Sequence, residues 1–338
     1  MKKRIALILL TPLILASCST EETYTSAILA FDSYFTCTYV SSIGSINDEI
    51  NAYISKVNRL ADPYTDYEEL NNLYKINRTN EALTVDPILF DLVKTAVDLY
   101  QKTEHNFNPF IGKITNVWKT TLFGESTDSA FNGPTISSIE ETKALIPSLL
   151  EEAKSTSVLL DEENCTITRV GQGHIDLGGL TKGYAVEQAE RMLEAKSIGM
   201  YLVNGGQSSL GLGKTQDNDK FTVNLKYSKS KYDNRFSLGE IDTSTSAIYE
   251  QSATVDGVTY SHIINPNTGM PLTDYSMAFL VGEDSALLDA FSTSCIIAGP
   301  DKAEEWGNKY GFAYSLFMDE GGYTKLVKES DSLSKARV

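Results

Sequence analysis

The feature that most constrains this fold is a set of short strand-like segments that turn back on themselves. Asp256-Gly257 separates residues 254–255 from residues 258–260, and this dipeptide strongly predicts a two-residue hairpin. Residues 312–318 and 323–327 predict a second hairpin. Strands joined by hairpins are antiparallel, so the sequence favours an α+β fold over a doubly wound parallel sheet.

Helices are predicted between the strands. Apolar residues recur at helical spacing over residues 47–60, 87–102 and 138–150. A further helix over residues 284–298 ends at Gly299-Pro300, which is a typical helix stop. We therefore expect one α+β domain with two antiparallel-rich sheets and surrounding helices.

The N-terminus has the features of an export signal. A basic start, residues 1–4, precedes an apolar run that is too short to span a bilayer as a permanent helix. The run ends in Leu15-Ala16-Ser17-Cys18, which resembles the lipobox of bacterial lipoproteins. That resemblance implies that residues 1–17 are removed, and that Cys18 is acylated and anchors the chain to a membrane, facing outside the cytoplasm. The alternative is an ordinary signal peptide with a chance cysteine.

The mature chain is expected to have three parts. A polar tether covers residues 18–26, a folded domain covers residues 27–328 and a polar tail covers residues 329–338. Within the domain, residues 27–40 alternate apolar and polar side chains and predict a strand, while the small and polar residues 126–134 predict a loop.

Composition argues against several ligand classes. The chain has 29 Lys and Arg against 45 Asp and Glu, and loss of the three basic signal residues leaves 26 against 45, a net charge of −19. So acidic a chain argues against nucleic acid and anionic lipid as ligands. Three histidines are too few for a histidine-rich zinc site. Cys37, Cys165 and Cys295 are an odd number without metal-type spacing, which argues against a disulfide scaffold.

The segment from His174 to Glu187 places a strand before a glycine turn and the start of a helix. Free backbone N–H groups at a helix N-terminus can hold an anion. Lys182 opposes the helix dipole there, and an anionic partner would explain it better than helix stability does. A tight turn with a solvent-facing lysine is an equally good interpretation of these residues alone.

Three polar side chains share one face of the apolar helix predicted over residues 284–298. Asp289, Ser292 and Thr293 lie at positions i, i+3 and i+4. A buried carboxylate needs a partner, and carboxylate and hydroxyl oxygens are ligands that magnesium prefers. The alternative is that Asp289 lies near the first helical turn or pairs with a buried lysine.

His262 follows a predicted hairpin strand and precedes an Asn-Pro-Asn-Thr-Gly turn over residues 265–269. Histidine suits proton transfer near neutral pH, and its ring can also donate to a phosphate. A structural role is the more common alternative for a histidine beside two isoleucines.

Taken together, these blocks resemble the ApbE family of FAD:protein FMN transferases from about residue 31 to residue 299. The family's lysine-glycine element is similar to residues 176–187, and its next block is similar to residues 202–206. Its histidine element is similar to residues 262–271, and its metal helix to residues 289–293. Four blocks in the family's order are far more specific than any one of them.

The resemblance implies an ApbE-type fold with a pocket for FAD and a magnesium site. The implied FAD-binding positions are Phe31, Tyr67, Asn106, Phe107, Asn108, Gly178, Lys182, Tyr184 and Ile263. Mg²⁺ would be held against the diphosphate by Asp289, Thr293 and the carbonyl of Thr181. The implied catalytic residues are Lys182, His262 and Asp289.

Several positions depart from the family pattern. Asn108 and Asn265 stand where the family has aspartate, and Asn267 stands where it has arginine. Thr181 replaces a small residue and Gln207 replaces an acid. The neutral Asn265 puts the balance between transfer and hydrolysis in question.

The implied reaction is attack by a threonine or serine hydroxyl of an exported acceptor protein on the FMN-side phosphorus of FAD, with AMP leaving. One alternative is a magnesium-dependent FAD diphosphatase, in which water replaces the hydroxyl and FMN is released. Another is a flavin-binding lipoprotein without turnover, in which Asp289 and Lys182 would serve affinity alone.

Overall fold

The structure is a computed structural model that describes residues 21–124, 138–225, 234–249, 251–273, 275–320 and 323–338. The expected signal peptide, Cys18 and the loop predicted over residues 126–134 lie outside these ranges. Among the described residues, none of the helices has the length and apolar character needed to cross a bilayer.

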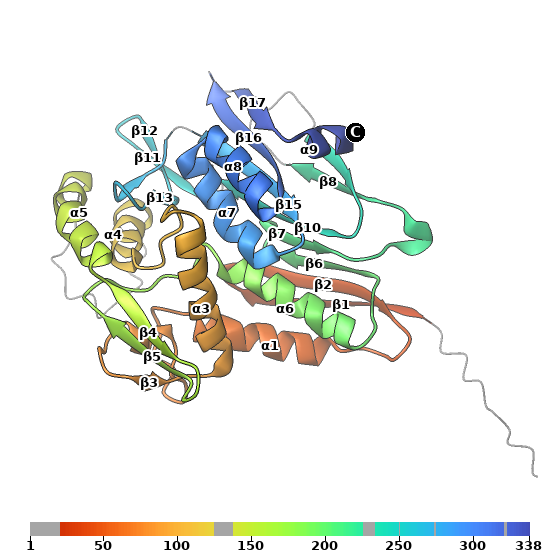
Figure 1. Cartoon of the computed structure of the whole chain (residues 1–338), viewed down its shortest axis with the longest axis horizontal. Coiled ribbons are helices and arrows are strands. Elements are labelled where there is room, and N and C mark those ends of the chain that lie inside the picture. The colour runs from red at the N-terminus through yellow and green to blue at the C-terminus, as the bar shows by residue number, and fades with distance from the viewer. Residues whose placement is uncertain (1–20, 125–137, 226–233, 250, 274, 321–322) are drawn as a thin grey trace, which may run out of the picture.

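A large antiparallel sheet forms the centre of the molecule (Figure 1). Its strand order is β1-β2-β6-β7-β10-β15-β16-β17. The strands are β1 (Glu22–Ala30), β2 (Ser33–Ser41), β6 (Tyr201–Gly205), β7 (Ser209–Leu212), β10 (Ile241–Ala247), β15 (Tyr275–Gly282), β16 (Ala313–Glu320) and β17 (Tyr323–Glu329). The α+β prediction is confirmed, as are the hairpin at Asp256-Gly257 and the pairing of β16 with β17.

Helices cover one face of this sheet (Figure 1). They are α1 (Asn47–Leu60), α6 (Thr181–Ala195), α7 (Ser285–Ala298) and α8 (Pro300–Tyr310). The opposite face is covered by the hairpin of β8 (Phe221–Leu225) and β9 (Asn234–Leu238), and by α9 (Asp331–Ala336). Each layer buries apolar side chains against the sheet, which is how a two-faced sheet is stabilised.

A second group of elements lies beside the helical layer. A three-stranded sheet has the order β3-β5-β4 and has helices next to it, while two short hairpins lie nearer to α7 (Figure 1). The strands are β3 (Leu83–Thr84), β4 (Ser157–Asp161), β5 (Thr166–Val170), β11 (Ser252–Val255), β12 (Val258–Ser261), β13 (Ile264–Asn265) and β14 (Met270–Pro271). The helices are α2 (Leu73–Ile76), α3 (Pro87–Lys102), α4 (Gly112–Phe123) and α5 (Ile139–Lys154), and a short 3₁₀ turn, η1, covers Gln216–Asn218.

The single strand predicted over residues 27–40 is wrong, because the chain reverses within it. β1 and β2 form a hairpin whose turn residues Phe31 and Asp32 have φ angles of 55° and 57°. Left-handed backbone is unusual for a phenylalanine. The turn is held by the Phe31 N–H, which donates to Asn58 Oδ1 at 2.7 Å.

Both predicted polar ends are more structured than the sequence suggests. β1 already begins at Glu22, and within the expected tether Ser26 is buried and donates to Asn51 Oδ1 at 2.6 Å. The expected tail contains α9, whose Leu333 is buried in the core under β8 and β9. Isolated apolar residues in short polar segments are too weak a pattern to predict such packing.

Candidate active site

The glycine turn before α6 is held by Asp176. Its Oδ1 accepts the N–H of Gly178 at 2.8 Å, and its Oδ2 accepts the hydroxyl of Thr115 at 2.6 Å. Thr181 begins α6 and is buried, and its hydroxyl donates to the Leu177 carbonyl at 2.7 Å. The Thr181 carbonyl, which the family resemblance assigns to the metal, lies in the first turn of this helix.

Helices α6 and α7 cross in close contact at Gly183. A Cβ at this position would lie 2.2 Å from the Ser285 carbonyl oxygen and 2.7 Å from Asp289 Cβ, so only glycine fits. The Gly183 N–H donates to Asp289 Oδ2 at 2.9 Å. The crossing therefore places the α7 carboxylate at the N-terminal turn of α6, beside Lys182.

Asp289 is 4% exposed, so its side chain is almost completely removed from water. Burial raises the pKa of this carboxyl, while the nearby Lys182 ammonium and the Gly183 N–H act in the opposite direction. A carboxylate that is removed from water needs a cation or several donors to remain ionised. The site thus has a carboxylate whose ionised form a bound cation would favour.

Hydroxyl groups from two elements surround this carboxylate. From β10, Ser244 Oγ lies 3.4 Å from Asp289 Oδ1, and Ser246 Oγ lies 2.7 Å from Ser292 Oγ and 2.9 Å from Thr293 Oγ1. Ser292 and Thr293 belong to α7, as the helical spacing predicted. The i, i+3, i+4 face of α7 therefore points toward β10, and the prediction that these three residues share one face of the helix is confirmed.

These residues fit a magnesium ion that also binds phosphate oxygens. Among the described residues there is no group of three or more His, Cys, Asp or Glu side chains placed to hold a metal, so a site built only of such ligands is not present there. Magnesium commonly binds one or two carboxylates and completes its shell with substrate phosphates and water. The fully buried Ser209 hydroxyl is a further oxygen beside Asp289.

Lys182 lies between Asp289, with the hydroxyl groups around it, and the β1–β2 turn. A Cβ on Gly206 would lie 3.6 Å from Lys182 Cδ and 2.7 Å from Ser33 Oγ. Gly206, Lys182 and Ser33 therefore lie side by side. Lys182 is half-buried and forms no ion pair with any described residue. Phe31, in the same turn as Ser33, is half-buried and packs against the cores of both groups of elements. The structure thus brings Phe31 and Lys182 to one region.

His262 follows β12, and its Nδ1 lies 3.0 Å from the carbonyl oxygen of Gln251. A carbonyl only accepts, so Nδ1 carries the proton and Nε2 has a free lone pair in the neutral ring. Burial lowers the pKa of His262, the hydrogen bond to Gln251 partly offsets this, and Lys182 and Lys119 lower the pKa again. A neutral ring with Nε2 unprotonated can accept a proton but cannot donate to a phosphate through Nε2, which favours the proton carrier over the phosphate donor.

The loop containing Asn106, Phe107 and Asn108 contacts two other predicted blocks. Asn267 Nδ2 donates to Asn106 Oδ1 at 3.4 Å, and a Cβ on Gly179 would lie 3.5 Å from Phe107 Cε2. Asn108 Oδ1 accepts the Phe110 N–H at 2.8 Å and so holds the loop. This loop, the glycine turn and the Asn-Pro-Asn-Thr-Gly turn therefore meet.

The Asn-Pro-Asn-Thr-Gly turn is organised by Asn265. Its Oδ1 accepts the Asn267 N–H at 2.9 Å, and its carbonyl accepts the Gly269 N–H at 2.7 Å. Ile263, just before it, is buried, and its carbonyl accepts the Leu272 N–H at 2.9 Å. The side chain of Asn265 thus has a local structural role, which an aspartate would also perform.

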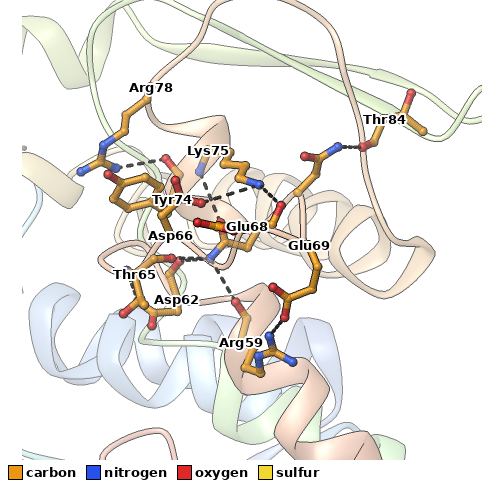
Figure 2. A network of polar contacts seen from close by, with 12 residues as sticks. Arg59, Asp62, Thr65, Asp66, Glu68, Glu69, Tyr74, Lys75, Arg78 and Thr84 are labelled. Atoms are coloured by element: carbon orange, nitrogen blue, oxygen red, sulfur yellow. Dashed lines mark hydrogen bonds and ion pairs between the residues drawn. The ribbon is translucent and has the colours of Figure 1, made fainter.

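Tyr67 belongs to a separate polar loop after α1. Asn72 Nδ2 donates to the carbonyls of Arg59, Asp62 and Thr65 and holds this loop, which Figure 2 shows from close by. The Tyr67 hydroxyl donates to Asp62 Oδ2 at 3.2 Å, and the Arg59 guanidinium lies 4.6 Å from its ring centre. No described contact joins Tyr67 to the residues above, so its place beside a flavin ring stays a prediction.

Tyr184 lies in the interior rather than at the surface of a pocket. It is 3% exposed, and its hydroxyl donates to Asp91 Oδ2 on α3 at 2.9 Å. Burial raises the pKa of this phenol. Tyr184 therefore has a structural role in the contact between α6 and α3. A contact between Tyr184 and FAD stays a prediction.

Comparison with known proteins identifies the family. Residues 31–316 match the ApbE family. The chain belongs to the ApbE family. Two curated relatives are named FAD:protein FMN transferase. The one from Escherichia coli K12 is 25% identical over 279 residues, covering 75% of this chain and 74% of the relative. The one from Haemophilus influenzae is 24% identical over 296 residues, covering 86% and 82%.

Solved structures show the ApbE fold. The flavin transferase ApbE from Vibrio cholerae has a TM-score of 0.75 at 19% identity, covering 94% of this chain and 100% of that one. The ApbE protein from Thermotoga maritima has a TM-score of 0.74 at 24% identity, with the same coverage. The predicted ApbE-type α+β fold is therefore confirmed.

Sequence reasoning missed parts of this ApbE site. The hydroxyl of Ser209 and the contact between Gly183 and Asp289 join elements far apart in the chain, and no local pattern indicates them. Ser244 and Ser246 lie in a Thr-Ser-Thr-Ser segment whose polarity is visible in the sequence. Alternation along a strand could have placed both on one face, since they are two residues apart.

Proposed function

We propose that this ApbE-family chain transfers the FMN half of FAD to a threonine or serine hydroxyl of an acceptor protein and releases AMP. The observation that carries the proposal is the buried Asp289 carboxylate, placed by α7 at the N-terminal turn of α6 among serine and threonine oxygens. The names of the curated relatives support the same reaction.

In this proposal, Asp289, Thr293 and the Thr181 carbonyl hold Mg²⁺, which when bound neutralises charge on the FAD diphosphate. Lys182 lies near Asp289, and its ammonium has no ion-pair partner among the described residues. It is therefore available to contact the same phosphates. A cation already in position can stabilise charge as it develops on the bridging oxygen and on the departing AMP.

His262 is proposed to take the proton of the attacking hydroxyl at Nε2. Its hydrogen bond to the Gln251 carbonyl orients the ring, and its lowered pKa keeps it neutral near pH 7. The hydroxyl oxygen then forms a bond to the FMN-side phosphorus, and the bond from that phosphorus to the bridging oxygen breaks. AMP leaves with that oxygen.

Two other outcomes share this site. Water in place of the hydroxyl would give free FMN and AMP, and a protein without turnover would leave FAD unchanged. Incubating the purified chain with FAD and magnesium, with and without an exported flavoprotein subunit from the same genome, separates them. Covalent flavin on the subunit supports transfer; FMN without covalent flavin, or unchanged FAD, overturns it.

We also propose that Cys18 carries a lipid anchor and that the enzyme acts on exported proteins at a membrane. The support is the basic and apolar N-terminus that ends in Leu15-Ala16-Ser17-Cys18. Fractionating cells that express Cys18→Ala tests the anchor. Wild-type amounts of the variant in the membrane pellet would argue against it.

A further inference from the structure

The two ends of strand β1 have different surroundings. One end is the Phe31 turn beside Ser33, Gly206 and Lys182, which belongs to the candidate site. The other end, at Glu21 and Glu22, is where the chain from Cys18 enters the domain. Strands rise by about 3.4 Å per residue, so Glu22 and Ala30 are about 27 Å apart. The candidate site and the point of chain entry therefore lie at opposite ends of one strand.

The distance from Cys18 to the domain is short. Cys18 and Glu21 are three residues apart, and three residues of fully extended chain reach at most about 11 Å. β1 is fixed from Glu22 onward by its pairing with β2. A lipid on Cys18 would therefore hold this end of the domain at the bilayer surface.

The surface around Glu21 has features that suit such contact. A cavity of about 290 Å³ is lined by Glu21, Ile43, Lys196 and Lys214, together with the turns that carry them. Ile43 is 63% exposed in the loop between β2 and α1, where its neighbours in sequence are Ser42 and Gly44. Lys196 pairs with Glu49 at 3.0 Å, whereas Lys214 is exposed and forms no ion pair with any described residue. An exposed aliphatic side chain beside a lysine is the combination found at membrane interfaces.

We propose that this surface, which we call the Ile43 face, lies against the phospholipid headgroups of the membrane that holds Cys18. The Ile43 side chain then inserts at the boundary between headgroups and acyl chains, and the Lys214 ammonium contacts a lipid phosphate. The anchor supplies the attachment, so the net negative charge of the chain does not prevent the contact. The candidate site is held on the side away from the bilayer, where the acceptor segment of another membrane-bound protein must reach it. This inference rests on the lipid anchor proposed above.

Tryptophan quenching tests the orientation. The full-length, lipid-modified chain carrying Ile43→Trp is reconstituted into phosphatidylcholine vesicles whose acyl chains are brominated close to the headgroup. Leu29→Trp is the matched control, because Leu29 is 68% exposed on β1 but lies at the opposite end of the β1–β2 hairpin, near the Phe31 turn. The natural residues Trp118 and Trp306 are 1% and 0% exposed and give a constant background.

The expected result is that bromine quenches most of the fluorescence added by Ile43→Trp and that its emission shifts to the blue, while Leu29→Trp keeps the emission of a solvated indole. Adding Lys214→Glu to the Ile43→Trp protein should reduce the quenching. Equal quenching at both positions, or stronger quenching of Leu29→Trp, overturns the Ile43 face. Failure of the full-length protein to associate with vesicles overturns the anchor and this inference with it. FMN transfer to a soluble acceptor, measured in the same preparation, reports on the proposed reaction separately.

Discussion

The Asp289 carboxylate accepts the backbone N–H of Gly183 at 2.9 Å, and this contact joins α7 to the first turn of α6. The two residues are far apart in the chain, yet the absence of a side chain at Gly183 lets the helices approach closely enough for the bond to form. The same first turn carries Lys182 and the Thr181 carbonyl. The geometry of the proposed metal site therefore depends on the crossing of these two helices.

Asp289→Asn should lower magnesium-dependent FAD turnover by more than about 100-fold. The amide keeps the shape of the side chain but removes the one carboxylate of the proposed metal set, and metal stabilisation of charge is worth several kcal/mol. Steady-state release of AMP from FAD is the measurement. Ser294→Ala is the control, because Ser294 lies on the same helix and its hydroxyl donates to the Ala290 carbonyl at 2.8 Å. Equal rates in Asp289→Asn and the wild type would remove the metal-helix hypothesis.

Gly183→Ala should destabilise the domain by about 1–3 kcal/mol, because the new methyl group would meet the Ser285 carbonyl and Asp289 Cβ at less than contact distance. Turnover should fall as well, since α6 and α7 must separate. Urea unfolding measures the first effect and AMP release the second. Gly239→Ala serves for comparison, because a Cβ there meets nothing within 4 Å. If both variants unfold at the same urea concentration, the close helix crossing is not required.

Asn265→Asp should raise the dissociation constant for FAD while leaving the transfer rate equal or higher. An added negative charge next to a diphosphate opposes FAD binding, yet it supplies another candidate base for the incoming hydroxyl. Aspartate can accept the Asn267 N–H as asparagine does, so the turn should persist. Fluorescence titration of FAD and acceptor flavinylation are measured on one preparation. If Asn265 only holds the turn, neither quantity changes by more than about twofold, or 0.4 kcal/mol. Tighter FAD binding would contradict the charge argument.

Stability should fall as pH rises above about 5, in part because of Glu190. This side chain is buried on α6 against Gly211, and it shares a hydrogen bond with Asp242 on β10. Burial and the neighbouring Asp242 raise the pKa of Glu190, so the folded protein keeps a proton that the unfolded chain releases above its ordinary pKa of about 4.3. A raised pKa gives stability that is complete below the unfolded value and is lost as pH rises.

Glu190→Gln should flatten this pH dependence, because a neutral amide can still donate to Asp242 and has no proton to lose. Urea unfolding at a series of pH values between 5 and 8 provides the comparison, with Glu140→Gln as an exposed control in the first turn of α5. Parallel pH profiles for the wild type and Glu190→Gln would show that Glu190 is ionised in the folded protein.

Local patterns predicted the regular elements well. The helices expected over residues 47–60 and 87–102 have those bounds in the structure, because apolar residues recur at helical spacing in both. The second helix also has a capping Asp86 and begins with Pro87. The hairpin at Asp256-Gly257 was also predicted, since its φ angles of 51° and 79° suit this dipeptide. The turn at Phe31-Asp32 has the same handedness but lacks the residues that normally indicate it, so its hairpin was interpreted as one strand.

The candidate site was predicted in part. The polar face of α7 follows from helical spacing, and the family resemblance named Lys182, His262 and Asp289. The contact between Gly183 and Asp289, the buried Ser209 hydroxyl beside Asp289 and the Glu190–Asp242 pair could not be predicted, because each depends on the crossing of elements that are distant in sequence. The hydrogen bond that fixes the proton of His262 on Nδ1 likewise depends on the position of the Gln251 carbonyl.

The most direct test of the proposed transferase is the intact mass of an acceptor subunit incubated with the wild-type chain, FAD and magnesium, with AMP quantified in the same reaction. We expect the subunit to gain the mass of one FMN phosphoester at a single threonine or serine, with one AMP released for each attached flavin. Replacing that acceptor residue by valine or alanine should abolish both the mass gain and the matched AMP. AMP release with free FMN and no change in the mass of the subunit would show that the chain hydrolyses FAD instead of transferring FMN.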